Sequence, residues 1–343
     1  MDASVTFVLT VVAVALVFDF INGFHDSANS IATVVATRVL TPGIAVIFAA
    51  GCNFLAAFVV GTAVAKTVSK GLIDPSIVTP TLLCAALLGA ITWNLVTWWL
   101  GLPSSSSHAL LGGFAGAAIA KAGTQSIIFS GWVKPLIAIV VSPLLGMILG
   151  LLLSVILSWS LWKRDARTME ALFRRLQLVS AGLYSLAHGS NDAQKTMGII
   201  VGLLVSAQAL FAGESGFLAH FHLVTADKVP LWVEMASYSA IAAGTAMGGW
   251  RIVKTMGTGI TKLKPFGGFC AETGGAMTIL FASYLGVPVS TTHTITGAIV
   301  GVGASKRLGA VRWGVAGRIV WAWFLTIPAS ALVAALFFWL LPS

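Results

Sequence analysis

Charge is the scarcest property of this sequence. Only 9% of its 343 residues are Asp, Glu, Lys or Arg, whereas 57% are hydrophobic and the mean hydropathy is +0.95. A soluble domain has roughly a quarter charged residues, so this composition excludes an ordinary soluble fold. Each of the long apolar stretches can cross the hydrocarbon core of a bilayer, which predicts an all-α polytopic membrane protein. They occupy residues 3–22, 43–65, 81–102, 135–162, 231–250 and 313–341.

Cysteine is also scarce, and its positions exclude a disulfide framework or a zinc site. Cys52, Cys84 and Cys270 all lie in apolar stretches, and their spacing is not that of metal ligands. The neighbouring Ser107 and His108 resemble a nucleophile and base, but adjacent residues of a helix point away from each other. No nucleophile-elbow sequence accompanies them. We therefore expect neither an enzyme nor a covalent cofactor.

The basic residues are concentrated between the apolar stretches. The net charge is +9, yet clusters of this kind indicate loop orientation rather than nucleic-acid binding. The densest cluster divides the chain into a first transmembrane repeat (1–162), a basic linker (163–176) and a second transmembrane repeat (177–343). The positive-inside rule places this linker in the cytoplasm. Its basic residues are Lys163, Arg164, Arg167, Arg174 and Arg175.

The two halves share two internal sequence matches. Residues 23–29 match residues 189–195, and residues 101–108 match residues 286–293. The second match continues with identical spacing through paired glycines to Lys121 and Lys306. Internal repeats of this kind are typical of transporters, whose substrate sites lie between the repeats.

Loop charge favours an inverted relation between the repeats. The loops near 66–79 and 121–134 are less basic than their counterparts near 251–264 and 305–318. Equivalent loops of an inverted pair lie on opposite sides of the membrane. Counting crossings from a cytoplasmic linker then places both termini outside. The sequence thus predicts inverted-topology repeats.

The first pair of matching segments predicts a cation site. Asp26 and Asp192 are carboxylates in otherwise apolar segments, where an ionisable residue is costly unless it has a function or a partner. Each follows a glycine, Gly23 or Gly189, at which we expect the helix to be broken and its carbonyls exposed. Carboxylate, amide and carbonyl oxygens suit a hard cation. The neighbouring amides are Asn29 and Asn191.

The second pair predicts an anion site. Pro103 and Pro288 each precede hydroxyl side chains and a short apolar segment that suits a re-entrant half-helix. Proline with Ser or Thr indicates a helix start, whose free N–H groups can bind an oxyanion. Two such starts facing each other can hold a tetrahedral anion, although ordinary helix capping is the alternative. The hydroxyl residues are Ser105, Ser106, Ser107, Ser290, Thr291 and Thr292.

Four further polar residues within the membrane have open roles. Glu272 precedes the second hydroxyl cluster, and it either joins a cation site or stabilises the hairpin. Lys195 either pairs with an aspartate or lines the anion path. His108 and His293 end the two hydroxyl clusters, and we interpret them first as hydrogen-bonding scaffolds and second as proton-linked groups.

These segments give the chain a resemblance to a known family. The sequences GFHDSANSIAT at 23–33, HGSNDAQK at 188–195 and VPVSTTH at 287–293 are similar to those of the inorganic phosphate transporter (PiT) family, especially its bacterial low-affinity members. The resemblance implies an inverted-repeat fold with two re-entrant helical hairpins whose hydroxyl-rich tips bind phosphate. It also implies that Asp26, Asn29 and Asp192 bind the coupling cation or a metal.

The second signature departs from the family pattern. Many members repeat an Ala-Asn ending there, whereas this chain has Gln194 and Lys195. A cation ligand equivalent to Asn29 is therefore missing from the second half, and the symmetry of the ion sites is in doubt.

The resemblance leads us to expect phosphate import by cation symport through the bacterial inner membrane. A phosphate dianion beside two aspartates requires positive charge to enter with it. Protons are favoured over Na⁺, and a divalent metal complexed with phosphate is a third possibility. The alternatives are a sulfate permease of the same fold and an anion channel. Membrane lipid is an expected partner, and a homodimer is expected by analogy.

Overall fold

The computed structural model describes residues 4–69 and 75–341, and regular structure in this part of the chain is entirely helical. The apolar helices long enough to cross a membrane confirm the prediction of an integral membrane protein. They are α1 (Val5–Ala36), α4 (Pro80–Trp99), α6 (Phe129–Ser160) and α13 (Trp313–Leu340). A further long helix, α7 (Ala166–Ser206), was not among the predicted apolar runs because it contains several charged residues.

Two of the predicted spanning runs are interrupted. The run at 43–65 forms α2 (Pro42–Leu55) and, after a break, α3 (Ala63–Ser69). The run at 231–250 forms α9 (Leu231–Met247), and α10 (Trp250–Lys254) follows it after Gly248 and Gly249. Broken helices are therefore present as the sequence predicted, but they occur in these two runs, for which single spanning helices were expected.

The helix breaks predicted at Gly23 and Gly189 are absent, because α1 and α7 run through them without interruption. Both glycines instead allow close helix contacts. A Cβ at Gly23 would lie 2.1 Å from the carbonyl oxygen of Ile241 in α9, and one at Gly189 would lie 2.8 Å from Cα of Asn53 in α2. The prediction was wrong because a glycine needed for close approach has the same sequence signature as one needed for unwinding.

The predicted linker is mostly helical. Helix α7 begins at Ala166 after an N-cap formed by Asp165, whose carboxylate accepts a 2.9 Å hydrogen bond from the backbone N–H of Thr168. That hydrogen bond lowers the pKa of the exposed Asp165 carboxyl group. Only residues 161–165 connect α6 to α7 outside a helix.

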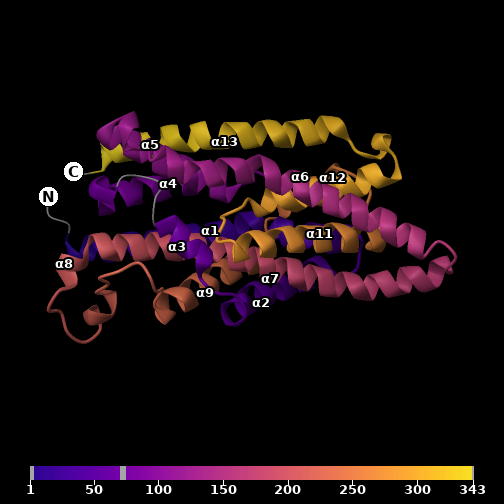
Figure 1. Ribbon diagram of the computed structural model, residues 1–343, viewed down its shortest axis with the longest axis horizontal. Helices are drawn as coiled ribbons and strands as arrows, with labels where there is room; N and C mark the ends of the chain where they lie inside the picture. The colour runs from indigo at the N-terminus through magenta and orange to yellow at the C-terminus, as the bar shows by residue number, and fades with distance from the viewer. Residues whose placement is uncertain (1–3, 70–74, 342–343) are drawn as a thin grey trace.

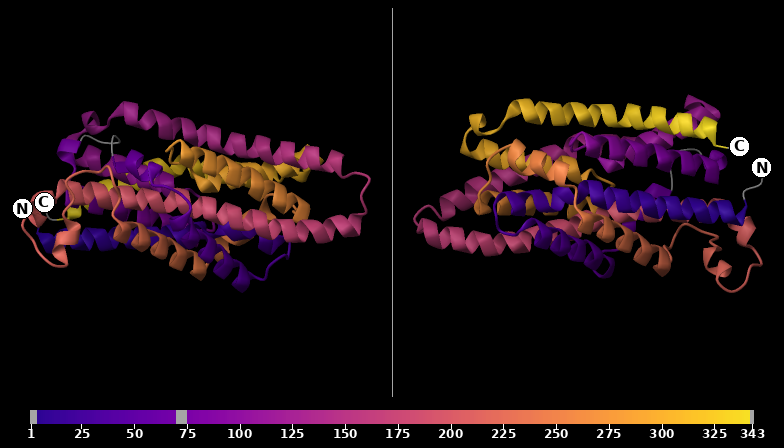
Figure 2. Two further views of the ribbon diagram at one scale, coloured as in Figure 1. Left: turned by 60° about the horizontal axis from the view of Figure 1, so that its bottom comes forward. Right: turned by 180° about the vertical axis from the view of Figure 1, so that it is seen from behind.

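The helices of the two halves run in opposite directions. Helix α1 starts at the end of the molecule where both chain termini lie, whereas α7 starts at the α6–α7 turn at the other end (Figure 1). Helix α4 and α5 (Ser106–Ala122) form a hairpin from the terminal end, and α11 (Pro265–Tyr284) and α12 (Thr291–Lys306) form one from the turn end (Figures 1 and 2). The two hairpin tips meet midway along the molecule.

The remaining helices are short and lie in the connections. They are η1 (Ala56–Phe58), η2 (Pro75–Ile77), η3 (Thr124–Ser126), α8 (Gln208–Phe211), η4 (Leu218–Phe221), η5 (Thr255–Gly259) and η6 (Leu308–Ala310). Lys70 and Asp74, which contribute to the loop-charge comparison, lie outside the described residues.

Each hairpin packs against a long helix of the other half. In α5, a Cβ at Gly116 would lie 2.0 Å from the carbonyl oxygen of Ala331 in α13. In α12, a Cβ at the equivalent Gly301 would lie 2.1 Å from the carbonyl oxygen of Met147 in α6. Small residues allow helix backbones to approach closely in this way in membranes. The halves proposed from the sequence are therefore interlocked through these helix contacts.

We predict that Gly116→Ala destabilises the protein by about 1–3 kcal/mol, because the new methyl group would collide with backbone that cannot move independently. Thermal unfolding in detergent measures the effect. Gly317→Ala in α13 is the control, since a Cβ at that position has no described atom within 4 Å. Equal stability of the two variants would contradict the close packing of α5 on α13.

Candidate functional site

The two predicted aspartates meet at the centre of the molecule. Asp26 of α1 is 3% exposed and Asp192 of α7 is fully buried. Together with His188 they offer ligand atoms that all lie within 4.8 Å of one another. The close contacts of α1 with α9 and of α7 with α2 hold these carboxylates in place. Two carboxylates this close in a buried site require a positive charge or several hydrogen-bond donors.

The hairpin tips provide such donors. Ser106 at the start of α5 donates to Asp26 Oδ1 at 3.3 Å, and the equivalent Thr291 of α12 donates to Asp192 Oδ2 at 3.2 Å. Thr292 donates to Asp26 Oδ2 at 3.4 Å. Asp26, Asp192 and the tip hydroxyls therefore form one continuous cluster rather than two separate sites.

Ser105 and Ser290 serve as helix caps in this structure. The Ser105 hydroxyl accepts the backbone N–H of His108 at 3.3 Å, and that of Ser290 accepts the N–H of His293 at 3.2 Å. The capping interpretation thus applies to the first hydroxyl of each tip. Both helix starts face the carboxylate cluster through the hydroxyls that follow.

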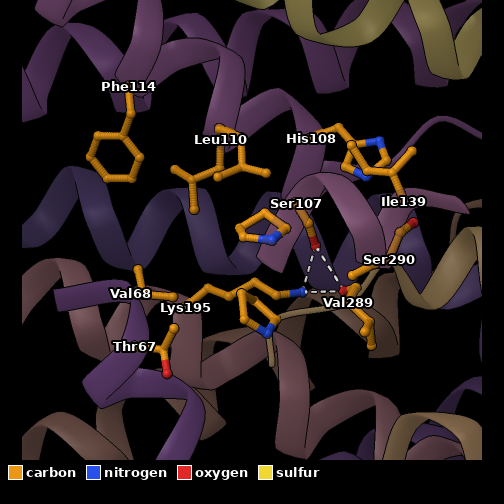
Figure 3. Close-up of a pocket in the computed structure, with 14 residues that line it drawn as sticks. Thr67, Val68, Ser107, His108, Leu110, Phe114, Ile139, Lys195, Val289 and Ser290 are labelled. Atoms are coloured by element: carbon orange, nitrogen blue, oxygen red, sulfur yellow. Dashed lines mark hydrogen bonds between the residues drawn. The ribbon is translucent and has the colours of Figure 1, made fainter. Parts of the chain in front are cut away.

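Asn29 and Lys195 link the cluster to opposite tips. The Asn29 amide donates to the Thr292 hydroxyl at 2.9 Å. The Lys195 ammonium donates to Ser107 Oγ at 2.5 Å, to the Val289 carbonyl at 2.9 Å and to Asp192 Oδ1. The Ser107 hydroxyl in turn donates to the Val289 carbonyl at 3.3 Å. Figure 3 shows the ammonium between Ser107 and Val289, which join the two tips. Of the two roles open for Lys195, pairing with an aspartate is confirmed.

A small cavity adjoins this junction. Its volume is about 30 Å³, which exceeds the space needed for one water molecule. Polar groups from α3, α5, α7 and the second tip line it together with apolar residues that include Leu110, Phe114 and Ile139 (Figure 3). The polar residues at this cavity are Thr67, Ser107, His108, Lys195 and Ser290.

Sequence reasoning missed His25 as a site residue. Its Nδ1 lies 2.6 Å from Asp26 Oδ1, and its Nε2 lies 3.0 Å from Thr97 Oγ1 and 3.3 Å from Ser104 Oγ. His25 therefore connects the Asp26 carboxylate to the first hairpin. Its position directly beside Asp26 was the available signal.

His188 was missed as well. Its Nδ1 lies 3.3 Å from the amide oxygen of Asn53, and its Nε2 faces Asp192 Oδ2 at 3.3 Å. Asn53 donates its own amide N–H to Thr245, so its oxygen is the atom that faces His188. Spacing of four residues between His188 and Asp192 places both on one face of a helix, which was the signal in the sequence.

Asn191, a predicted cation ligand, contacts the second hairpin instead of the carboxylates. The Asn191 amide donates to Ser283 Oγ at 2.9 Å and to the Val287 carbonyl at 3.3 Å, and its oxygen accepts the N–H of Val289 at 3.1 Å. Asn191 thus holds the backbone of the second tip, and these contacts do not support a role as cation ligand.

Glu272 lies in a separate polar cluster. Its carboxylate accepts a 3.0 Å hydrogen bond from Gln177 and a 2.5 Å hydrogen bond from Ser180. Gln177 also accepts from Thr37, the C-cap residue of α1, at 2.9 Å. These bonds join α1, α7 and α11, so the contacts favour the stabilising role over the cation role for Glu272.

His108 and His293 pack against each other behind the tips. Their ring centroids are 4.4 Å apart in a T-shaped arrangement, and His293 stacks on Trp323 at 3.7 Å. The contacts of these rings are packing contacts rather than the side-chain hydrogen bonds predicted from the sequence.

Comparison with known proteins identifies the family of this chain. The model of the phosphate transporter family matches residues 22–334. A probable low-affinity inorganic phosphate transporter of Rhizobium meliloti is 56% identical over 339 residues, covering 98% of this chain and 97% of the relative. One of Bacillus subtilis is 43% identical over 343 residues, covering 99% of both chains.

A solved structure is also similar to this chain over nearly its whole length. It is titled the sodium-dependent phosphate transporter, is 25% identical, and covers 98% of each chain with a TM-score of 0.86. The resemblance inferred from the repeated Asp and hydroxyl segments is thereby confirmed, and the relatives are transporters rather than enzymes. The chain is an integral membrane protein that belongs to the phosphate transporter family.

Proposed function

We propose that this protein imports inorganic phosphate by symport with a cation. The observation that carries the proposal is that the tip hydroxyls donate to Asp26 and Asp192. A hydroxyl has one hydrogen to donate, so Ser106, Thr291 and Thr292 cannot donate to phosphate while they donate to an aspartate.

A cation at the carboxylates resolves this competition. When it binds Asp26 or Asp192, it replaces the hydroxyl hydrogen as the partner of the carboxylate oxygen, and the hydroxyl becomes free for the anion. The cation also removes the repulsion between phosphate and two buried carboxylates. In this proposal, Asp26, Asn29 and Asp192 bind the cation. The hydroxyls of Ser105, Ser106, Ser107, Ser290, Thr291 and Thr292 and the helix starts of α5 and α12 bind phosphate.

Protons are the favoured coupling ion. His25 and His188 both lie against the carboxylates, and a carboxylate beside an imidazole provides a place for a proton. Na⁺ is the alternative, because the solved relative is named a sodium-dependent transporter.

Uptake of radiolabelled phosphate into proteoliposomes tests the function. We expect saturable uptake that concentrates phosphate when a proton gradient is imposed, that resists excess sulfate, and that Asp26→Asn abolishes because the cation loses a charged ligand. Ser158→Ala in α6, remote from the site, is the control.

Other outcomes would reassign the protein. Uptake driven by a Na⁺ gradient alone would replace protons by Na⁺. Competition by sulfate would indicate a sulfate permease, and flux that neither saturates nor responds to any gradient would indicate an anion channel.

A divalent metal complexed with phosphate is a further candidate for the transported species, favoured by the position of His188. Because Nδ1 of His188 faces the Asn53 oxygen, Nδ1 carries the hydrogen and Nε2 presents its lone pair to the carboxylates. An imidazole nitrogen and two carboxylates form a donor set that suits a divalent metal better than Na⁺.

We predict that His188→Asn raises the metal concentration needed for half-maximal stimulation of phosphate uptake by about tenfold or more. Asparagine keeps a polar atom towards Asn53 but has none at the position of Nε2. His222→Asn, at an exposed position, is the control. Unchanged metal stimulation in His188→Asn would exclude His188 as a ligand.

The inverted-repeat arrangement is supported by the opposite directions of α1 and α7 and of the two hairpins (Figure 1). In this arrangement the hairpins are re-entrant, and movement of one repeat against the other exposes the tips to alternate sides. The basic α6–α7 turn lies in the cytoplasm and both termini lie outside the bacterial inner membrane.

Cysteine labelling tests this orientation. On a cysteine-free background, we expect a membrane-impermeant maleimide added to intact cells to label Ser215→Cys in the α8–α9 connection but not Lys163→Cys in the turn. Both positions are exposed, so they react equally once the cells are permeabilised. Labelling of Lys163→Cys alone in intact cells would invert the orientation.

A further inference from the structure

We propose that the Lys195 ammonium is a tethered cation that permanently occupies the place of a co-transported cation in the second half of the site. One mobile cation then binds around Asp26 and Asn29, close to the Asp192 oxygen that Lys195 leaves open, and no second mobile cation is needed. This inference rests on the proposed symport and concerns how many cations accompany each phosphate.

The structure makes Lys195 the spatial counterpart of Asn29. Each lies three residues after its aspartate, and each donates to a hydroxyl of the hairpin from the opposite half. Asn29 donates to Thr292, and Lys195 donates to Ser107, which occupies the equivalent position of the other tip. The two halves therefore match in three dimensions at this point, while one carries a neutral amide and the other a cation.

The ammonium has the surroundings expected of a bound hard cation. Its oxygen partners are the carboxylate of Asp192, the hydroxyl of Ser107 and the backbone carbonyl of Val289. Three acceptors match the three hydrogens of an ammonium group, and the same oxygen types coordinate hard metal cations. Lys195 is only 2% exposed, so solvent does not compete for these contacts.

Asp26 lacks an equivalent partner. Among the described residues, the Asp26 carboxylate contacts His25, Ser106 and Thr292. No ion pair among these residues joins Asp26 to a lysine or an arginine. A cation that binds and leaves can therefore use the Asp26 carboxylate as a ligand. The other available groups are the hydroxyls of Ser106 and Thr292 and the nearby Asn29 amide.

The charges lead to a stoichiometric consequence. Asp26 and Asp192 carry two negative charges, and Lys195 neutralises one of them. One negative charge therefore remains for a mobile cation to neutralise before phosphate binds. A transporter with an amide in place of Lys195 needs one more cation for the same neutralisation. Lys195 therefore lowers by one the number of positive charges that move with each phosphate.

The Lys195→Asn variant tests this inference, because it restores the side chain found at Asn29. We expect the variant to acquire a Na⁺ requirement that the wild type does not have. Reversal-potential measurements in proteoliposomes should show one further positive charge moving with each phosphate. In detergent without phosphate, Na⁺ should raise the melting temperature of Lys195→Asn more than that of the wild type, since a bound ion stabilises the folded state.

Lys121→Asn is the matched control. Lys121 is a partly buried lysine that donates to the Ile77 carbonyl and to Thr79, and neither partner belongs to the carboxylate cluster. We expect this control to keep the charge per phosphate and the Na⁺ response of the wild type.

Two results would overturn the inference. One is a Lys195→Asn protein with the wild-type charge per phosphate and Na⁺ response. The other is a folded Lys195→Asn protein whose phosphate uptake no cation concentration restores, which would make Lys195 a direct ligand of the anion. Absence of saturable phosphate uptake by the wild type would instead refute the proposed function, so the two failures are distinguishable.

The mirrored variant Asn29→Lys tests the inference even if Lys195→Asn does not fold. A second tethered cation beside Asp26 should remove the remaining cation dependence of phosphate binding. Cation dependence equal to that of the wild type in folded Asn29→Lys would overturn the inference.

Discussion

The contacts between the hairpin hydroxyls and the two buried carboxylates are the interaction on which the rest of the structure depends. Asp26 and Asp192 lie in the interior of an apolar helical protein, where an isolated carboxylate is very costly. Each is compensated by groups from several elements, including a tip hydroxyl and a neighbouring histidine or lysine. The helices must therefore bring both tips to the centre.

Glycine packing makes this geometry possible. Gly23 and Gly189 let α9 and α2 approach the helices that carry the aspartates, while Gly116 and Gly301 let each hairpin pack on a long helix of the other half. Because each hairpin is held by the opposite half, any movement of α13 or α6 displaces the tip packed against it. This interlocking connects the carboxylate cluster to α13 and α6, as the proposed alternating access requires.

The two halves share a backbone plan but differ in chemistry. His25 and Asn191 occupy equivalent positions and both hold a hairpin tip, one through an imidazole and the other through an amide. Asn29 and Lys195 are likewise equivalent but differ by a full charge. In the proposed inverted repeat, these substitutions give the two halves different charges at equivalent positions.

The sequence by itself determined the membrane class, the long apolar helices α1, α4, α6 and α13 and the segments that carry the buried aspartates and hydroxyls, because these depend on local composition and on a repeat that can be read along the chain. It did not determine where the helices break, since Gly23 and Gly189 allow either unwinding or close contact, and only Ile241 and Asn53 decide between them. Nor did it assign Glu272, Asn191 or His188, whose partners are distant in sequence. Only the tertiary structure gives those partners, because the surroundings of a buried polar group depend on the helices packed against it.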